Sequence, residues 1–214
     1  MRIILIEKAH RGAKYVVHFD EGADILLSKE VIIDFGLRKN DELDDARLRD
    51  IHETQSYHDA YAAALRLLNY RMRTKRELFQ RLEKKTFAGP IIERVADKLQ
   101  SLGLLDDSAF AEAYISDKGA SKPIGKRELE RRLREKGLSK ETISGALAAV
   151  GTDEKQLELA SAAAETKMRS LARFAGREKQ EKLIAFLLRR GFEWGVVKKV
   201  VKSLTKEEVN ENDF

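Results

Sequence analysis

Hydrophobic and polar positions follow two different periods along the 214 residues of the chain. Near the N-terminus, three short runs are rich in β-branched and aromatic residues, which favour strands. These runs are residues 2–7, 14–19 and 23–27. Ser28 is placed to cap a short helix that runs to Phe35 and ends at Gly36. The pattern predicts a small β-meander that packs against its neighbours, because two or three strands alone are only marginally stable.

From about Tyr57 the period changes to 3.6 residues, and the chain begins to repeat itself. Lys75–Lys85 (KRELFQRLEKK) and Lys126–Lys136 (KRELERRLREK) lie 51 residues apart and are identical at seven of eleven positions. A third copy follows at an offset of 54, with Gly191 in the place of Gly137. Each copy adds a later helix with an apolar i, i+3, i+4, i+7 stripe and an earlier helix. The earlier helices are expected at 57–71, 108–118 and 154–173.

The repeats predict a mainly α fold, an elongated tandem array of three three-helix repeats with a small β-containing N-terminal module. The composition agrees, because only two prolines interrupt a chain in which 36% of the residues are charged. The expected parts are 1–55 (the β-meander and short helices), 56–107 (repeat one), 108–152 (repeat two), 153–204 (repeat three) and 205–214 (a tail).

Charge is distributed unevenly between these parts. Residues 1–55 hold 9 Lys and Arg against 12 Asp and Glu, whereas residues 56–214 hold 32 against 24. A basic array favours an acidic partner, such as DNA or a protein filament that coats DNA. The alternative is a well-solvated helical surface whose charges have no partner outside the chain.

The repeated middle helix carries the most informative pattern. At 100° per residue, Leu129 and Leu133 fall within about 40° of each other and form a buried stripe. Arg127, Arg131 and Arg134 cluster on nearly the opposite side, which predicts a basic ridge. Such a ridge suits phosphates or carboxylates, because the guanidinium fork pairs with both in a bidentate manner.

The candidate surface for a partner or DNA extends over the first two repeats. It consists of Arg71, Arg73, Lys75, Arg76, Arg81, Lys126, Arg127, Arg131, Arg132, Arg134 and Lys136. The competing interpretation is a solvated face with ion pairs such as Glu130–Arg134.

Catalytic and cofactor motifs are lacking in the sequence. The absence of cysteine excludes disulfides, thiolate metal sites and Cys nucleophiles. The four histidines have no metal-ligand spacing. Gly119–Lys126 (GASKPIGK) departs from a phosphate-binding loop, because five residues separate its glycines and Arg127 follows where Ser or Thr would bind magnesium. We therefore expect a protein that is not an enzyme and needs no cofactor or metal.

Targeting segments are not indicated either. The N-terminal apolar run is too short for a signal peptide, and no stretch approaches the ~20 apolar residues of a membrane span. The expected location is the cytoplasm, without contact to a membrane.

Three motifs, in order along the chain, resemble the signatures of the RecX family of bacterial recombination regulators. The first is R-x-R-T-x-x-E-L-x-x-x-L at 71–82, and the second is L-D-D-x-x-F-A at 105–111. The third comprises Gly125, Arg127, Leu129, Leu133, Lys136 and Gly137. The resemblance covers about residues 56–204, and repeat three departs from it most.

The resemblance implies a non-enzymatic modulator of the RecA recombinase. Family members bind the RecA filament on single-stranded DNA, limit its growth or promote its disassembly, and so reduce its ATPase activity, strand exchange and stimulated repressor cleavage. We expect this chain to act as a monomer on that filament and to inhibit it. Two alternatives stay open, a direct DNA-binding protein that competes for single- or double-stranded DNA, and an enzyme such as a nuclease.

Overall fold

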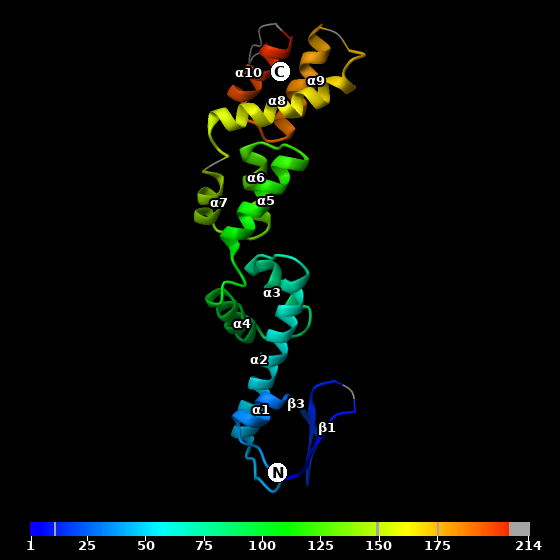
Figure 1. Ribbon diagram of the computed structural model, residues 1–214, viewed down its shortest axis with the longest axis vertical. Helices are drawn as coiled ribbons and strands as arrows, with labels where there is room; N and C mark the ends of the chain where they lie inside the picture. The colour runs from blue at the N-terminus through cyan, green and yellow to red at the C-terminus, as the bar shows by residue number, and fades with distance from the viewer. Residues whose placement is uncertain (11, 149, 175, 206–214) are drawn as a thin grey trace. The chain divides into compact units, whose positions relative to one another are not determined.

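The computed structural model describes residues 1–10, 12–148, 150–174 and 176–205. These residues form two compact units, which are considered separately. The first unit comprises residues 1–72 and 78–105, and the second comprises residues 73–77 and those from 106 onward. Figure 1 traces the elements along the chain from the N-terminal sheet to the last helix.

The N-terminal module is a three-stranded antiparallel sheet with one short helix against it. Its strands are β1 (Ile3–Lys8), β2 (Tyr15–Phe19) and β3 (Ile25–Leu27), in the order β1-β2-β3, followed by α1 (Lys29–Asp34). Ser28 accepts a hydrogen bond from the backbone N–H of Val31 and so caps α1. The predicted strands and cap are therefore confirmed. The core of the module holds Ile3, Val17, Leu27, Val31 and Ile51, each at most 1% exposed.

The helix expected over 57–71 begins earlier than its pattern indicated. The structure has a single 26-residue helix, α2 (Asp45–Tyr70), which starts at an Asp44 cap that accepts the Arg47 N–H at 2.7 Å. Ile51 lies in the core of the N-terminal module, whereas Ala60 lies in the core of the first repeat. The boundary expected at residue 56 thus falls inside one helix, because each half of α2 is buried against a different core.

The first repeat is completed by α3 (Lys75–Glu83) and α4 (Gly89–Ser101). The expected apolar stripe of α4 is buried, with Ile92, Val95 and Leu99 fully inaccessible. Alanines on α2, which are short, allow α4 to approach closely, and this pair of helices forms the main packing of the repeat.

The second and third repeats have the same three-helix order. Repeat two comprises α5 (Asp107–Ser121), α6 (Lys126–Glu135) and α7 (Lys140–Leu147), and repeat three comprises α8 (Asp153–Ser170), α9 (Gly176–Arg189) and α10 (Trp194–Thr205). Each repeat encloses a hydrophobic core of its own. The predicted mainly α fold of three-helix repeats with a small sheet is confirmed. Apart from Thr205, the expected tail lies outside the described residues.

None of the helices that the structure describes has the length and apolar character needed to cross a membrane.

Candidate nucleic-acid or partner interface

Helix α6 carries the predicted leucine stripe and the predicted arginines on separate sides. Leu129 and Leu133 are at most 2% exposed, which confirms the buried stripe. The arginines on the other side are not an uninterrupted basic ridge. Arg131 pairs with Glu128 and Glu135, and Arg134 pairs with Glu130 one turn earlier. The Glu130–Arg134 ion pair, which belongs to the competing interpretation of a solvated face, is therefore present.

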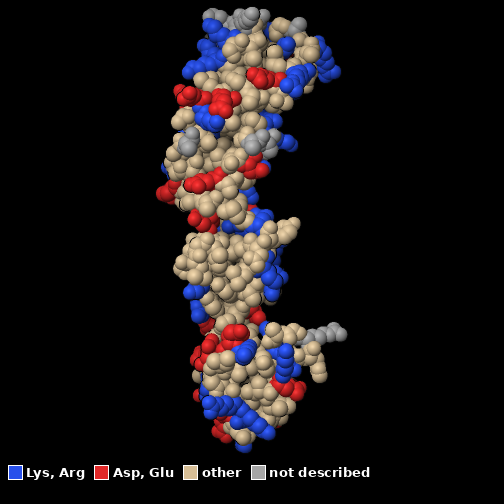
Figure 2. All heavy atoms as spheres, viewed as in Figure 1, with Lys and Arg blue, Asp and Glu red and all other residues tan. Residues whose placement is uncertain are grey.

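Carboxylates also accompany the cations elsewhere on this surface. Arg127 lies 3.7 Å from Glu193, measured from Nε to Oε1. On the face drawn in Figure 2, acidic and basic side chains are interspersed over the second and third repeats. The net charge of α6 is therefore smaller than its count of arginines suggests.

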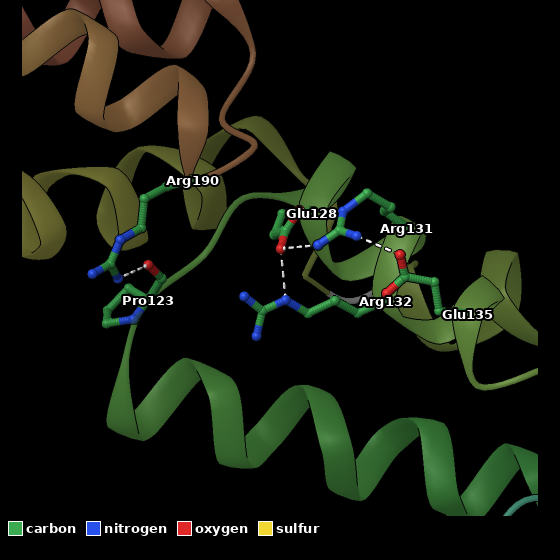
Figure 3. Close-up of polar contacts among 6 residues, drawn as sticks. All are labelled: Pro123, Glu128, Arg131, Arg132, Glu135 and Arg190. Carbon is green, nitrogen blue, oxygen red and sulfur yellow. Dashed lines mark hydrogen bonds and ion pairs between the residues drawn. The ribbon is translucent and has the colours of Figure 1, made fainter. Parts of the chain in front are cut away.

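Glu128 is held by two arginines at once. Arg131 donates to both of its carboxylate oxygens, at 2.7 and 2.8 Å, and Arg132 Nε donates to Oε1 at 2.6 Å (Figure 3). The hydrogen bond from Arg131, followed by that from Arg132, lowers the pKa of Glu128 from 4.5 to about 2, against the opposing effect of desolvation. Glu128 is therefore ionised at neutral pH.

The lowered pKa makes stability depend on pH in a defined direction. Ionised Glu128 stabilises the fold above about pH 4.5, and this contribution is lost as the pH falls from there toward 2. We expect Glu128→Gln to cost about 1 kcal/mol at neutral pH, since the arginines are partly solvated. In urea titrations the variant should lose less stability than the wild type between neutral pH and pH ~2.5. Equal losses for the two proteins would contradict the prediction.

The first joint is the set of contacts that residues 73–77 make with residues 106–107 and 136–137. It lies within the second unit. Thr74, which is fully buried, donates from Oγ1 to the carbonyl of Lys136 at 2.8 Å and accepts the Glu77 N–H at 3.1 Å. Lys136 Nζ lies 2.8 Å from Glu77 Oε1. Asp107 accepts the N–H of Lys75 at 2.9 Å. These contacts hold the start of α3 against the N-terminal end of α5 and the C-terminal end of α6.

A second joint connects residues 123–128 to residues 156 and 190–191. The carbonyls of Arg190 and Gly191 accept the N–H groups of Gly125 and Arg127, at 2.8 and 3.2 Å. Gln156 accepts the N–H of Lys126 at 3.0 Å. The N-terminal amides of α6, which have no partner within the helix, are thus satisfied by the third repeat. The two joints are built alike, because the start of one middle helix meets the end of the next.

Several of the predicted surface residues are buried or make contacts within the joints. Arg73 is only 7% exposed, so the structure does not place it on an accessible surface, contrary to the expectation. Lys136 is bound to Glu77 and lies over the rings of Phe110 and Tyr114. An amphipathic pattern on one helix does not reveal such burial, because the covering residues lie far away in the sequence.

The remaining candidates differ in how their charge is used. Arg71 donates to the carbonyl of Met72, and Lys75 is half-buried at the start of α3. Arg132 shares Glu128 with Arg131. Three cations form no ion pair with any other described residue, namely Arg76, Arg81 and Lys126. These three are members of the predicted surface whose charges no described carboxylate balances.

Sequence analysis did not identify Asp107, Gln156, Gly125 and Gly191 as the residues that join one repeat to the next. The available signals were the recurrence of Gly137 at Gly191 and the presence of Asp107 and Gly125 in the RecX-like motifs. Within the described residues, no group of three or more His, Asp or Glu is arranged to hold a metal ion.

Comparison with protein-family models gives three matches in chain order. The first three-helix domain of RecX matches residues 60–99, the second matches residues 106–147, and the third matches residues 153–201. Together the matches span more than half of the chain. The chain belongs to the RecX family.

Relatives in the family match over most of their length. The regulatory protein RecX of Chlorobaculum tepidum is 39% identical over 150 residues, which cover 70% of this chain and 91% of the relative. The regulatory protein RecX of Finegoldia magna is 30% identical over 201 residues, which cover 94% of this chain and 98% of the relative. RecX proteins of this kind are named as regulators, and the predicted family is confirmed.

Solved RecX structures agree with the fold. A crystal structure of a regulatory protein RecX has a TM-score of 0.77 at 28% identity and covers 93% of this chain and 98% of its own. The structure of RecX from Lactobacillus salivarius has a TM-score of 0.66 at 26% identity, with 72% and 99% coverage.

The RecX-like motifs have a structural role in this chain. In L-D-D-x-x-F-A, Leu105 is buried in the first core, Asp106 caps α5, Asp107 belongs to the first joint, and Phe110 and Ala111 enter the second core. The motif therefore supplies buried residues to two cores and the cap of α5, and of the residues named here only Asp106 is exposed.

Proposed function

We propose that this RecX-family chain regulates the RecA recombinase by binding the RecA filament on single-stranded DNA. In this proposal it inhibits filament growth, and with it ATP hydrolysis and strand exchange. It acts as a cytoplasmic monomer, catalyses no reaction and uses no cofactor. The observation that carries the proposal is membership of a family of regulatory proteins, matched by all three of its three-helix domains.

The distribution of charge supports a partner that is contacted at many points. Equivalent middle helices α3 and α6 present Arg76, Arg81 and Lys126 without an ion pair to another described residue. Exposed ion pairs contribute only about 0.2–1 kcal/mol each. Binding through such contacts accordingly needs several of them, spread over successive repeats, and weakens with salt.

The test is the ATPase rate of RecA on single-stranded DNA with increasing amounts of this protein. A decline at ratios far below one molecule per RecA is expected, because a block to filament growth affects many RecA subunits. If ATP hydrolysis falls only when the DNA itself is saturated, the protein competes for DNA and the proposal fails.

The unpaired cations give a sharper version of this test. We expect Arg81→Glu combined with Lys126→Glu to raise the concentration for half-inhibition by about tenfold, as expected from reversing one exposed and one partly exposed contact. Helicity should not change, since neither side chain makes an ion pair with another described residue. The matched control reverses Lys198 and Lys199, which are exposed on α10. Equal losses in both double variants would show a general charge effect, and would remove α3 and α6 from the model.

Direct binding to DNA is the second candidate function. It is favoured by the same unpaired cations, which neutralise phosphates as readily as carboxylates. An affinity for bare DNA equal to that for the filament, with the same dependence on salt, would favour this alternative.

A further inference from the structure

The second joint differs from the first in the use of its charges. In the first joint Glu77 neutralises Lys136, with 2.8 Å between the charged atoms. The counterparts of these two residues in the second joint, by the offsets of 51 and 54, are Glu128 and Arg190. Glu128 pairs with Arg131 and Arg132, whereas Arg190 donates to the carbonyl of Pro123 at 2.9 Å. Arg190 thus retains a positive charge that no carboxylate among the described residues balances.

A single substitution between the repeats accounts for this change. Arg131, the strongest partner of Glu128, has Gln80 as its counterpart in the first repeat. An amide there cannot draw a carboxylate away as a guanidinium does, because it carries no charge. Glu77 therefore remains available to Lys136, and Glu128 does not remain available to Arg190.

A cleft of about 500 Å³ is lined by Arg190, whose charge no described carboxylate balances. It lies within the second unit, between the end of α5, one side of α6 and the end of α9. Figure 3 shows Arg132 pointing from α6 toward the side of the joint where Arg190 and Pro123 lie. The cationic lining consists of Lys118, Lys122, Arg132, Arg189 and Arg190, and Glu128 is the single carboxylate.

The cations of this cleft fall into two classes. Lys118, Arg132 and Arg190 are held in place, by Asp117, by Glu128 and by the Pro123 carbonyl respectively. Lys122 and Arg189 are exposed and make no ion pair with another described residue. The cleft thus combines fixed donors with two cations that are free to close on an anion.

The lining favours a nucleic-acid backbone over a protein segment. Protein interfaces rely on exposed aromatic and apolar anchors at their centre. Here Ile124 is only 5% exposed, and Arg190 and Lys167 each lie over the ring of Phe186, at 4.8 and 5.5 Å from its centroid. Ile124 is therefore covered and the ring of Phe186 is already in contact with cations, whereas phosphate oxygens need only cations and N–H donors.

We propose that this cleft binds the phosphate groups of single-stranded DNA without reading its sequence. For the kind of nucleic acid, single-stranded DNA, the inference rests on the proposed function. Binding of the backbone does not require RecA to be present. The inference and the proposed function are therefore separable by experiment.

The experiment measures the fluorescence anisotropy of a labelled oligothymidylate with the full chain and no RecA. Lys122→Ala combined with Arg189→Ala should weaken binding about tenfold near 50 mM salt. The slope of log K against log salt should become shallower by about 1.4, the value for two lost contacts with a single strand. The matched control, Lys198→Ala with Lys199→Ala, removes the same charge from exposed positions of α10 and should bind like the wild type.

Several outcomes would overturn the inference. One is equal binding by the cleft variant and the control, and another is no binding of oligothymidylate by the wild type. A cleft variant that keeps its affinity for oligothymidylate but no longer inhibits RecA would show that the cleft receives a protein carboxylate. The ATPase assay on the same samples separates the two proposals. A wild type that binds through the cleft but leaves RecA unaffected would contradict only the proposed function.

Discussion

Replacing Gly125 with alanine should lower the free energy of unfolding of the second unit by about 3 kcal/mol, the upper end for overpacking. A Cβ atom at Gly125 would lie 2.2 Å from the carbonyl oxygen of Gly191 and 2.4 Å from the nitrogen of Phe192. Both are backbone atoms, so no side chain can turn aside, and the turn after α9 must move away from α6. That movement would break the hydrogen bond from Gly125 to Arg190.

The measurement is urea unfolding followed by the fluorescence of Trp194, the single tryptophan, which packs against the core of the third repeat. Gly145→Ala is the matched control, because Gly145 lies in α7 with no atom near its added Cβ. That variant should gain about 0.5–1 kcal/mol from the lower flexibility of the unfolded chain. If Gly125→Ala unfolds at the same urea concentration as the wild type, α6 and the turn at Gly191 do not pack as described.

Thr74→Val should cost about 2–3 kcal/mol, although valine has nearly the same shape as threonine. The hydroxyl of Thr74 is fully buried, accepts the N–H of Glu77 and donates to the carbonyl of Lys136. Valine removes the cap of α3 and leaves that carbonyl without this partner. The free energy of unfolding from urea titrations and the exchange rate of the Glu77 amide should both report the loss.

Thr74→Ser separates the hydroxyl from the methyl group. Serine keeps both hydrogen bonds and loses one buried methyl group, which amounts to about 1 kcal/mol. The serine variant should therefore be more stable than the valine variant. The reverse order would mean that packing, and not hydrogen bonding, holds Thr74 in the first joint.

Local patterns were sufficient to predict most of the fold. The repeat of KRELFQRLEKK at KRELERRLREK, the i, i+3, i+4, i+7 stripes and the cap at Ser28 each depend on residues a few positions apart. Contacts of this range are encoded in periodicity and capping chemistry. For the same reason the pattern alone predicts too late a start for α2, since the first half of this helix is buried in the core of the N-terminal module, which its own pattern does not reveal.

The candidate site is less predictable because the burial and the partners of its charged side chains depend on residues far away in the sequence. Whether Arg73 is buried, and whether Arg190 meets a carboxylate, depends on residues tens of positions away. A helical wheel showed Arg131 as part of a ridge, but it did not show that Arg131 would capture Glu128. Partner choice among neighbouring ions follows from three-dimensional geometry, which a single sequence does not display.

Helix α2 has a consequence for how the first unit loses its structure. Its N-terminal half buries Ile51 beside the sheet, and its C-terminal half buries Ala60, Ala63 and Ala64 beside α4. If the N-terminal half of α2 unwound, the shortened helix would lose the Asp44 cap, and the N–H groups at its new end would have no such partner. The sheet and the first repeat should therefore unfold cooperatively, as a single foldon. Damage to the small sheet would then be felt in the repeat that follows it.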